Sequence, residues 1–141
     1  MNKKLIKKLL ELLTGWVAYN VILALTYFIW DLMYTGNYNQ ISVRINDAII
    51  MLGNFLELTA AGFGIFVASY FIIQTRIFKE DIKTISLIII FHILMMGSFL
   101  ISLYLIKKIN PWLAPIELQF VFVVSTILVA VIPYFKRRIF E

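Results

Sequence analysis

Long apolar stretches alternate with short polar segments along the chain. A membrane-spanning α-helix needs about 20 consecutive apolar residues, because each helical residue rises only ~1.5 Å through a hydrocarbon layer ~30 Å thick. Four stretches reach this length, and the second exceeds it, so we expect the second helix to tilt. The pattern predicts an all-α, polytopic four-transmembrane-helix bundle that forms one transmembrane domain over residues 1–141. Its four spans cover approximately residues 15–34, 48–74, 85–106 and 112–135.

The segment before the first span has a different pattern. Residues 3–13 repeat paired lysines between leucines, which is typical of an amphipathic helix that lies on the membrane interface. The same residues could equally form only a basic flank of the first span. Both interpretations stay open.

Composition also favours lipid as the surroundings of the chain. Hydrophobic residues make up 62% of the 141 residues and charged residues 15%, whereas globular domains are about half apolar and a quarter charged. A water-soluble chain of this size would leave much of its apolar surface exposed. The sequence has no cysteine and one histidine, which excludes disulfides, cysteine metal sites and multi-histidine zinc sites. We expect no cofactor and no metal.

The basic residues, which produce a net charge of +5, lie beside the apolar stretches. This placement favours contact with anionic lipid headgroups and predicts no nucleic-acid partner. With four spans, ten of the 13 basic residues fall on one side of the bilayer and three on the other. Because cytoplasmic loops are enriched in lysine and arginine, we predict that both termini lie in the cytoplasm, in a multi-pass protein of the bacterial cytoplasmic (inner) membrane. The larger group is Lys3, Lys4, Lys7, Lys8, Arg76, Lys79, Lys83, Lys136, Arg137 and Arg138; the smaller is Arg44, Lys107 and Lys108.

Four ionisable side chains fall inside the predicted spans. Asp31 and Glu117 lie near the outer boundary, and we expect them to reach the headgroups. His92 lies nearer the cytoplasm and is either a packed, hydrogen-bonded residue or a gating or proton-sensing group, because imidazole titrates near neutral pH. Glu57 lies about ten residues into the second span, close to mid-membrane, where an ionisable group is costly.

Small residues share a helical face with Glu57. Spacings of three and four place them on one stripe, and such stripes allow close helix packing in lipid. We therefore expect Glu57 to point into a helix–helix seam, with Asn54 on a neighbouring face. This intramembrane polar site has two open interpretations: a protonated acid hydrogen-bonded across the seam, or a titratable group that lines a polar path. The packing stripe consists of Gly53, Ala60, Ala61, Gly64 and Ala68.

One short element bears on enzymatic function. Asn54-Phe55-Leu56-Glu57 resembles the Asn-x-x-Glu element of membrane glutathione-dependent enzymes of the leukotriene-synthase type, which are four-helix proteins of similar length. That family has an arginine four residues before the asparagine, where this chain has Ile50, so nothing here would stabilise a glutathione thiolate. The sequence has no Gly-rich phosphate loop and no Ser-His-Asp set. We expect a protein that is not an enzyme, with a small membrane enzyme as the less favoured alternative.

The architecture is similar to that of RexB-type membrane proteins, which phages and prophages use for exclusion. The shared features are the length, the four spans, the small-residue second span from Ala60-Ala61 onwards, and the cytoplasmic loop Thr75-Arg76-Ile77-Phe78-Lys79. The resemblance implies a bundle that depolarises the membrane when a cytoplasmic sensor is triggered. The expected function is a homo-oligomeric, channel-like or membrane-depolarising component, as in phage defence. The alternative is an immunity protein, scaffold or accessory subunit whose partner is a toxin or a membrane complex.

Overall fold

The computed structural model describes residues 2–35, 40–75, 80–108 and 116–141, and this part of the chain is helical with no strand. Long helices form because the apolar stretches contain few glycine or proline residues, which disfavour the helix. The all-α prediction is confirmed. The helices are α1 (Lys3–Thr35), α2 (Ile41–Thr75), α3 (Glu80–Lys107), α4 (Ile116–Val131), the short α5 (Pro133–Phe135) and the π-helix η3 (Lys136–Phe140).

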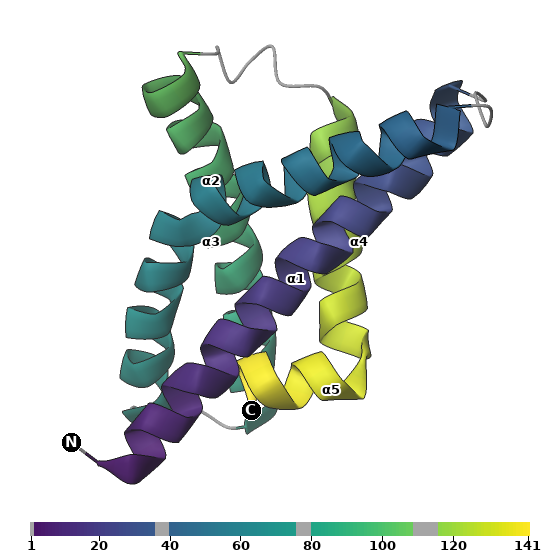
Figure 1. Cartoon of the computed structure of the whole chain (residues 1–141). Helices are drawn as coiled ribbons and strands as arrows, with labels where there is room; N and C mark the ends of the chain where they lie inside the picture. The colour runs from purple at the N-terminus through teal and green to yellow at the C-terminus, as the bar shows by residue number, and fades with distance from the viewer. Residues whose placement is uncertain (1, 36–39, 76–79, 109–115) are drawn as a thin grey trace.

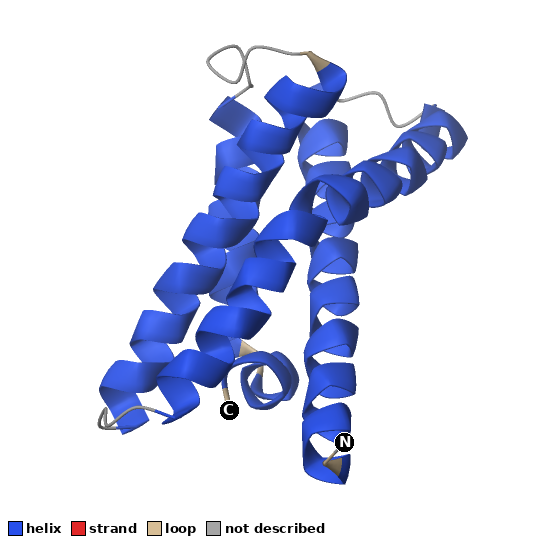
Figure 2. Ribbon diagram, turned by 90° about the vertical axis from the view of Figure 1, so that its left-hand side faces the viewer, coloured by secondary structure: helices blue, strands red, loops and turns tan. Residues whose placement is uncertain are grey.

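The helices pack in a ring of neighbours. α1 contacts α2, α2 contacts α3, and α4 returns to contact both α1 and α3. In Figure 1, the first part of α2 runs beside the end of α1, and its last part turns down beside α3. Both termini lie at the same end of the bundle in Figures 1 and 2, the arrangement that four crossings would produce. Which side of a membrane this end faces stays a prediction.

Several helices match the requirement for crossing a membrane. Lys3–Met33, Ile41–Ile72 and Thr84–Leu105 are long and apolar enough, and Leu118–Val131 with Pro133–Phe140 would make a fourth crossing only as a pair bent by 78°. The described chain thus has three to four helices of the kind that multi-pass membrane proteins contain.

The predicted fourth span ends earlier than expected. A continuous helix to residue 135 is wrong, because the backbone leaves the helix at Ile132, whose φ of −68° and ψ of 121° are extended. Pro133 causes this, since its ring disfavours the helical conformation at the preceding residue. Pro133 then begins the C-terminal segment Pro133–Phe140, which lies across the end of the bundle (Figure 1).

The first two helices begin earlier than expected. Residues 3–13 do not form a separate interfacial helix; they are the first part of the 33-residue α1. Gly15 costs about 1 kcal/mol of helix propensity relative to alanine, which is too little to break a helix that continues through apolar residues on both sides. α2 begins at Ile41, seven residues before the predicted start, and is 35 residues long.

Aromatic rings fill the centre of the bundle. Phe91 of α3 meets Tyr19 of α1 edge to face, with ring centroids 4.8 Å apart, and Phe66 of α2 at 5.0 Å. Phe55 of α2 and Phe122 of α4 form a similar contact at 5.9 Å. Such pairs contribute about 0.5–1.5 kcal/mol beyond the area they bury. Close packing of this kind, with no hydrophobic force to help it, is what holds helices together in lipid.

Candidate functional site: the Glu57 face of α2

Glu57 lies at the middle of α2 and on its outer side. It follows Ile41 by 16 residues and precedes Thr75 by 18, so its Cα lies about 24 Å along a helix roughly 50 Å long. The side chain is exposed at the surface of the chain. The residues before and after it at helical spacing are exposed as well. We call this surface the Glu57 face; it consists of Gly53, Glu57, Ala60, Ala61, Gly64 and Ala68.

Within the described part of the chain, nothing covers this face at its two glycines. A Cβ atom built at Gly53 or at Gly64 meets nothing within 4 Å. The expectation that Glu57 and the stripe point into a seam is therefore wrong for a seam within one chain. The opposite side of α2, with Phe55, Leu58 and Phe66, is the buried one.

The close approach that the stripe was expected to supply is made by Gly62 instead. Its N–H donates to Ser98 Oγ of α3 at 3.0 Å, and that hydroxyl donates to the Leu58 carbonyl at 2.9 Å. A Cβ atom at Gly62 would overlap the Leu94 carbonyl and lie 2.6 Å from Ser98 Cβ. Large apolar residues precede and follow Gly62 at helical spacing, and this pattern was the signal in the sequence for the buried side. They are Phe55, Leu58, Phe66 and Tyr70.

Asp31 and His92 have partners elsewhere in the molecule. Arg44 Nη1 of α2 donates to Asp31 Oδ2 of α1 at 3.0 Å, and both side chains are half-buried. Asp31 was expected only to reach the headgroups, and the ion pair was not foreseen. The side chain of Glu117 lies outside the described residues.

His92 joins α3 to α4. Its Nδ1 lies 3.0 Å from Thr126 Oγ1, which donates to the Phe122 carbonyl at 2.8 Å. With the threonine proton in that bond, the contact fits the tautomer of His92 in which Nδ1 donates to Thr126; the other tautomer would need the hydroxyl to turn toward the ring. The Tyr19 hydroxyl lies 3.4 Å from the same oxygen. This geometry is that of the packed, hydrogen-bonded alternative for His92; a gating role stays a prediction.

A second buried polar cluster between α1 and α2 was missed from the sequence. Trp16 Nε1 donates to Thr59 Oγ1 at 3.2 Å, and the one proton of that hydroxyl is shared between the Phe55 carbonyl one turn earlier and Asn20 Oδ1 at 3.2 Å. Asn20 Nδ2 donates to the Trp16 carbonyl at 2.9 Å. Asn20 and Thr59 are fully buried. The asparagine inside an apolar helix was the available signal, since such residues hydrogen-bond to neighbouring helices in lipid.

The predicted polar residues do not gather in one place. Asp31 pairs near one end of α1, His92 lies between α3 and α4, and Glu57 lies on the outer face of α2. Asn54 is half-buried, and its amide lies 4.0 Å from Met51 Sδ one turn earlier on α2. Among the described residues no three acidic or histidine side chains are grouped so that they could hold a metal ion. The arrangement offers one exposed carboxyl on a face of small residues, and interior polar groups that link helices.

Comparison with known proteins found no match: no family model, no curated protein and no solved structure is similar to this chain. The resemblance to RexB-type proteins stays an expectation from architecture.

Proposed function

We propose that this chain is a non-enzymatic membrane protein whose copies associate through the Glu57 face to form a channel-like assembly. One observation carries the proposal. A carboxyl side chain and five small residues share an exposed face at the middle of an apolar helix.

The carboxyl group of Glu57 makes lipid an unfavourable neighbour for this face. An acidic residue at the centre of a membrane helix costs about 2.5–3.5 kcal/mol on insertion scales, and such residues face protein or water instead of lipid. Small residues on the same face let the backbones of two helices approach closely. The carboxyl group and the small residues together favour contact between this side of α2 and another protein surface, and not contact with lipid.

Symmetry then explains why association would produce a path. In a closed ring of identical chains, equivalent residues surround one axis. Glu57 side chains would form an acidic ring at mid-membrane, and rings of this kind select cations. The centre of a single chain is filled by Phe55, Phe66 and Phe91, so the path in this proposal runs between copies.

The alternative is a scaffold, immunity protein or accessory subunit that presents the same face to another protein. The interior hydrogen bonds favour it: Asn20 with Thr59, and Ser98 with Gly62, link neighbouring helices. Hydrogen bonds that fix the positions of helices are expected in a rigid subunit that does not conduct ions.

Replacing Glu57 with glutamine discriminates between the two. Glu57→Gln keeps the shape and hydrogen bonding of the side chain but removes its titratable charge. In proteoliposomes, the channel proposal expects cation flux that falls several-fold, because the ring of acidic side chains is lost. Asp47→Asn is the matched control, because it removes a carboxylate from the same helix outside the Glu57 face. Equal flux from the parent and Glu57→Gln would contradict a conducting role for Glu57 and favour the scaffold.

A further inference from the structure

The two ends of the chain together line an open, basic pocket at the surface. It measures about 370 Å³ and lies between the first turns of α1 and η3. α1 contributes two of its cations and its apolar lining, and η3 contributes the third cation. The residues that matter are Lys3, Lys7 and Arg138, the apolar Ile6 and Leu10, and Glu11.

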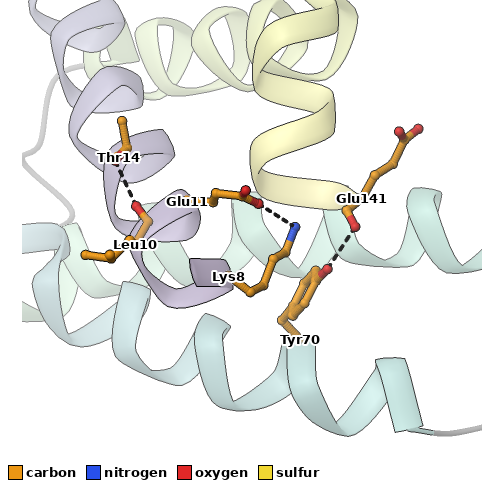
Figure 3. Close-up of polar contacts among 6 residues, drawn as sticks. All are labelled: Lys8, Leu10, Glu11, Thr14, Tyr70 and Glu141. Carbon is orange, nitrogen blue, oxygen red and sulfur yellow. Dashed lines mark hydrogen bonds and ion pairs between the residues drawn. The ribbon is translucent and has the colours of Figure 1, made fainter. Parts of the chain in front are cut away.

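The C-terminal segment is held in place by specific contacts. Ile139 and Phe140 are buried, and the segment rests on α1 at Gly15, where an added Cβ would lie 2.5 Å from Ile139 Cγ1. The Tyr70 hydroxyl of α2 donates to the Glu141 carbonyl at 3.1 Å (Figure 3). These contacts bring Arg138 from the far end of the sequence to Lys3 and Lys7.

The pocket has an excess of positive charge. Its one acidic residue, Glu11, faces Lys8 at 3.9 Å, and Lys8 also lies 5.1 Å above the Tyr70 ring (Figure 3). Within the described residues, Lys3, Lys7 and Arg138 form no ion pair. The three pocket cations therefore outnumber the one carboxylate, which itself has a partner outside the pocket lining.

The order of residues along α1 matches the layers of a membrane surface. Lys3 and Lys7 come first, and Leu10, which is 58% exposed, follows on the way into the apolar part of the helix. The rise from Lys3 to Leu10 is about 10 Å, more than the roughly 5–7.5 Å of one headgroup layer, so Leu10 lies at the depth of the acyl chains when Lys3 lies at the surface. Cations thus lie at headgroup level, with an apolar wall beneath them.

We propose that this pocket binds the phosphate of an anionic phospholipid, with Lys3, Lys7 and Arg138 around the phosphate oxygens and an acyl chain along Ile6 and Leu10. Arginine and lysine are the usual phosphate ligands, and basic pockets between membrane helices bind acidic headgroups. The proposal goes beyond self-association. It rests only on the chain lying in a bilayer and not on the Glu57 face.

The test compares two double variants of the full-length chain. Lys7→Gln/Arg138→Gln removes two pocket cations; Lys4→Gln/Arg137→Gln removes two exposed cations from the same segments, neither of which lines the pocket. Delipidated protein in detergent is titrated with phosphatidylglycerol, and bound lipid is counted by native mass spectrometry. We expect the pocket pair to weaken binding about thirtyfold, which is two cations at about 1 kcal/mol each. The control pair should weaken it about twofold or less, because its cations do not line the pocket. Phosphatidylcholine should bind the parent chain more weakly than phosphatidylglycerol.

Three outcomes would overturn the proposal. Equal weakening by both pairs would mean that only diffuse charge attracts the lipid. Displacement of phosphatidylglycerol by millimolar inorganic phosphate would mean a site for free phosphate. Unchanged binding by Leu10→Trp, which keeps every charge but fills the apolar wall, would mean that no acyl chain lies there. Helical circular dichroism verifies that each variant is folded. A chain that stays monomeric yet shows the expected pattern would contradict the Glu57 proposal and support this site.

Discussion

Gly62 and Gly64 are two residues apart on α2 and have opposite surroundings. Gly62 touches the backbone of α3, and its N–H bonds to Ser98. Gly64 has open space beside it. In a helix of a water-soluble protein, polar residues mark the outer side. Because α2 is apolar on both sides, the small size of Gly62 and Gly64 did not show which of them faces α3.

Gly62→Ala should therefore destabilise the fold. The added methyl group overlaps the Leu94 carbonyl and Ser98 Cβ, and overpacking of this kind costs about 1–3 kcal/mol. Gly97→Ala on α3 is the control, because a Cβ there meets nothing within 4 Å. Thermal unfolding in detergent should show a lower midpoint for Gly62→Ala only. Equal midpoints for the two variants would mean that α2 and α3 do not approach closely at Gly62.

Ionisable residues were easier to find than to pair. Asp31, Glu57 and His92 were evident as charges or imidazole inside apolar runs, because lipid makes such groups costly. Their partners were not: Arg44 was assigned to a polar connection, and Thr126 is unremarkable in sequence. Partner choice depends on how helices rotate against one another, which periodicity does not specify in a helix that is apolar on every side.

The C-terminal segment Pro133–Phe140 is the element whose position depends most on a few residues. Pro133 turns the chain by ending α4, and Ile139 fits against Gly15 of α1. The helices themselves were predictable from the lengths of the apolar runs. The bend was not, because a proline near a span end is compatible with either a bend or a straight exit.

Gly15→Leu should release this segment. The larger side chain occupies the space of Ile139, so the basic run Lys136–Arg138 should become more accessible. Trypsin should cleave after these residues several-fold faster than in the parent chain. Gly97→Leu, at a position with open space, should leave the rate unchanged. If Gly15→Leu is cleaved at the parental rate, the segment does not depend on its contact with α1.

At the scale of the whole molecule, both termini lie at one end of the bundle, and the basic-residue bias predicts that this end is cytoplasmic. Because the sequence contains no cysteine, single introduced cysteines report topology cleanly. In intact cells an impermeant thiol reagent should label Gln40→Cys, before α2, and leave Asn2→Cys unlabelled. Labelling of Asn2→Cys with none at Gln40→Cys would reverse the orientation.

Disulfide cross-linking in native membranes tests directly whether copies of the chain associate through the Glu57 face. Ala61→Cys lies on this face, and Ile93→Cys lies on an exposed side of α3. A disulfide needs Cα atoms within about 7 Å, a distance that only closely packed backbones reach. Upon oxidation, Ala61→Cys should yield a disulfide-linked dimer as the main species and Ile93→Cys only a trace. Cross-linking of Ala61→Cys no stronger than that of Ile93→Cys would contradict association through the Glu57 face.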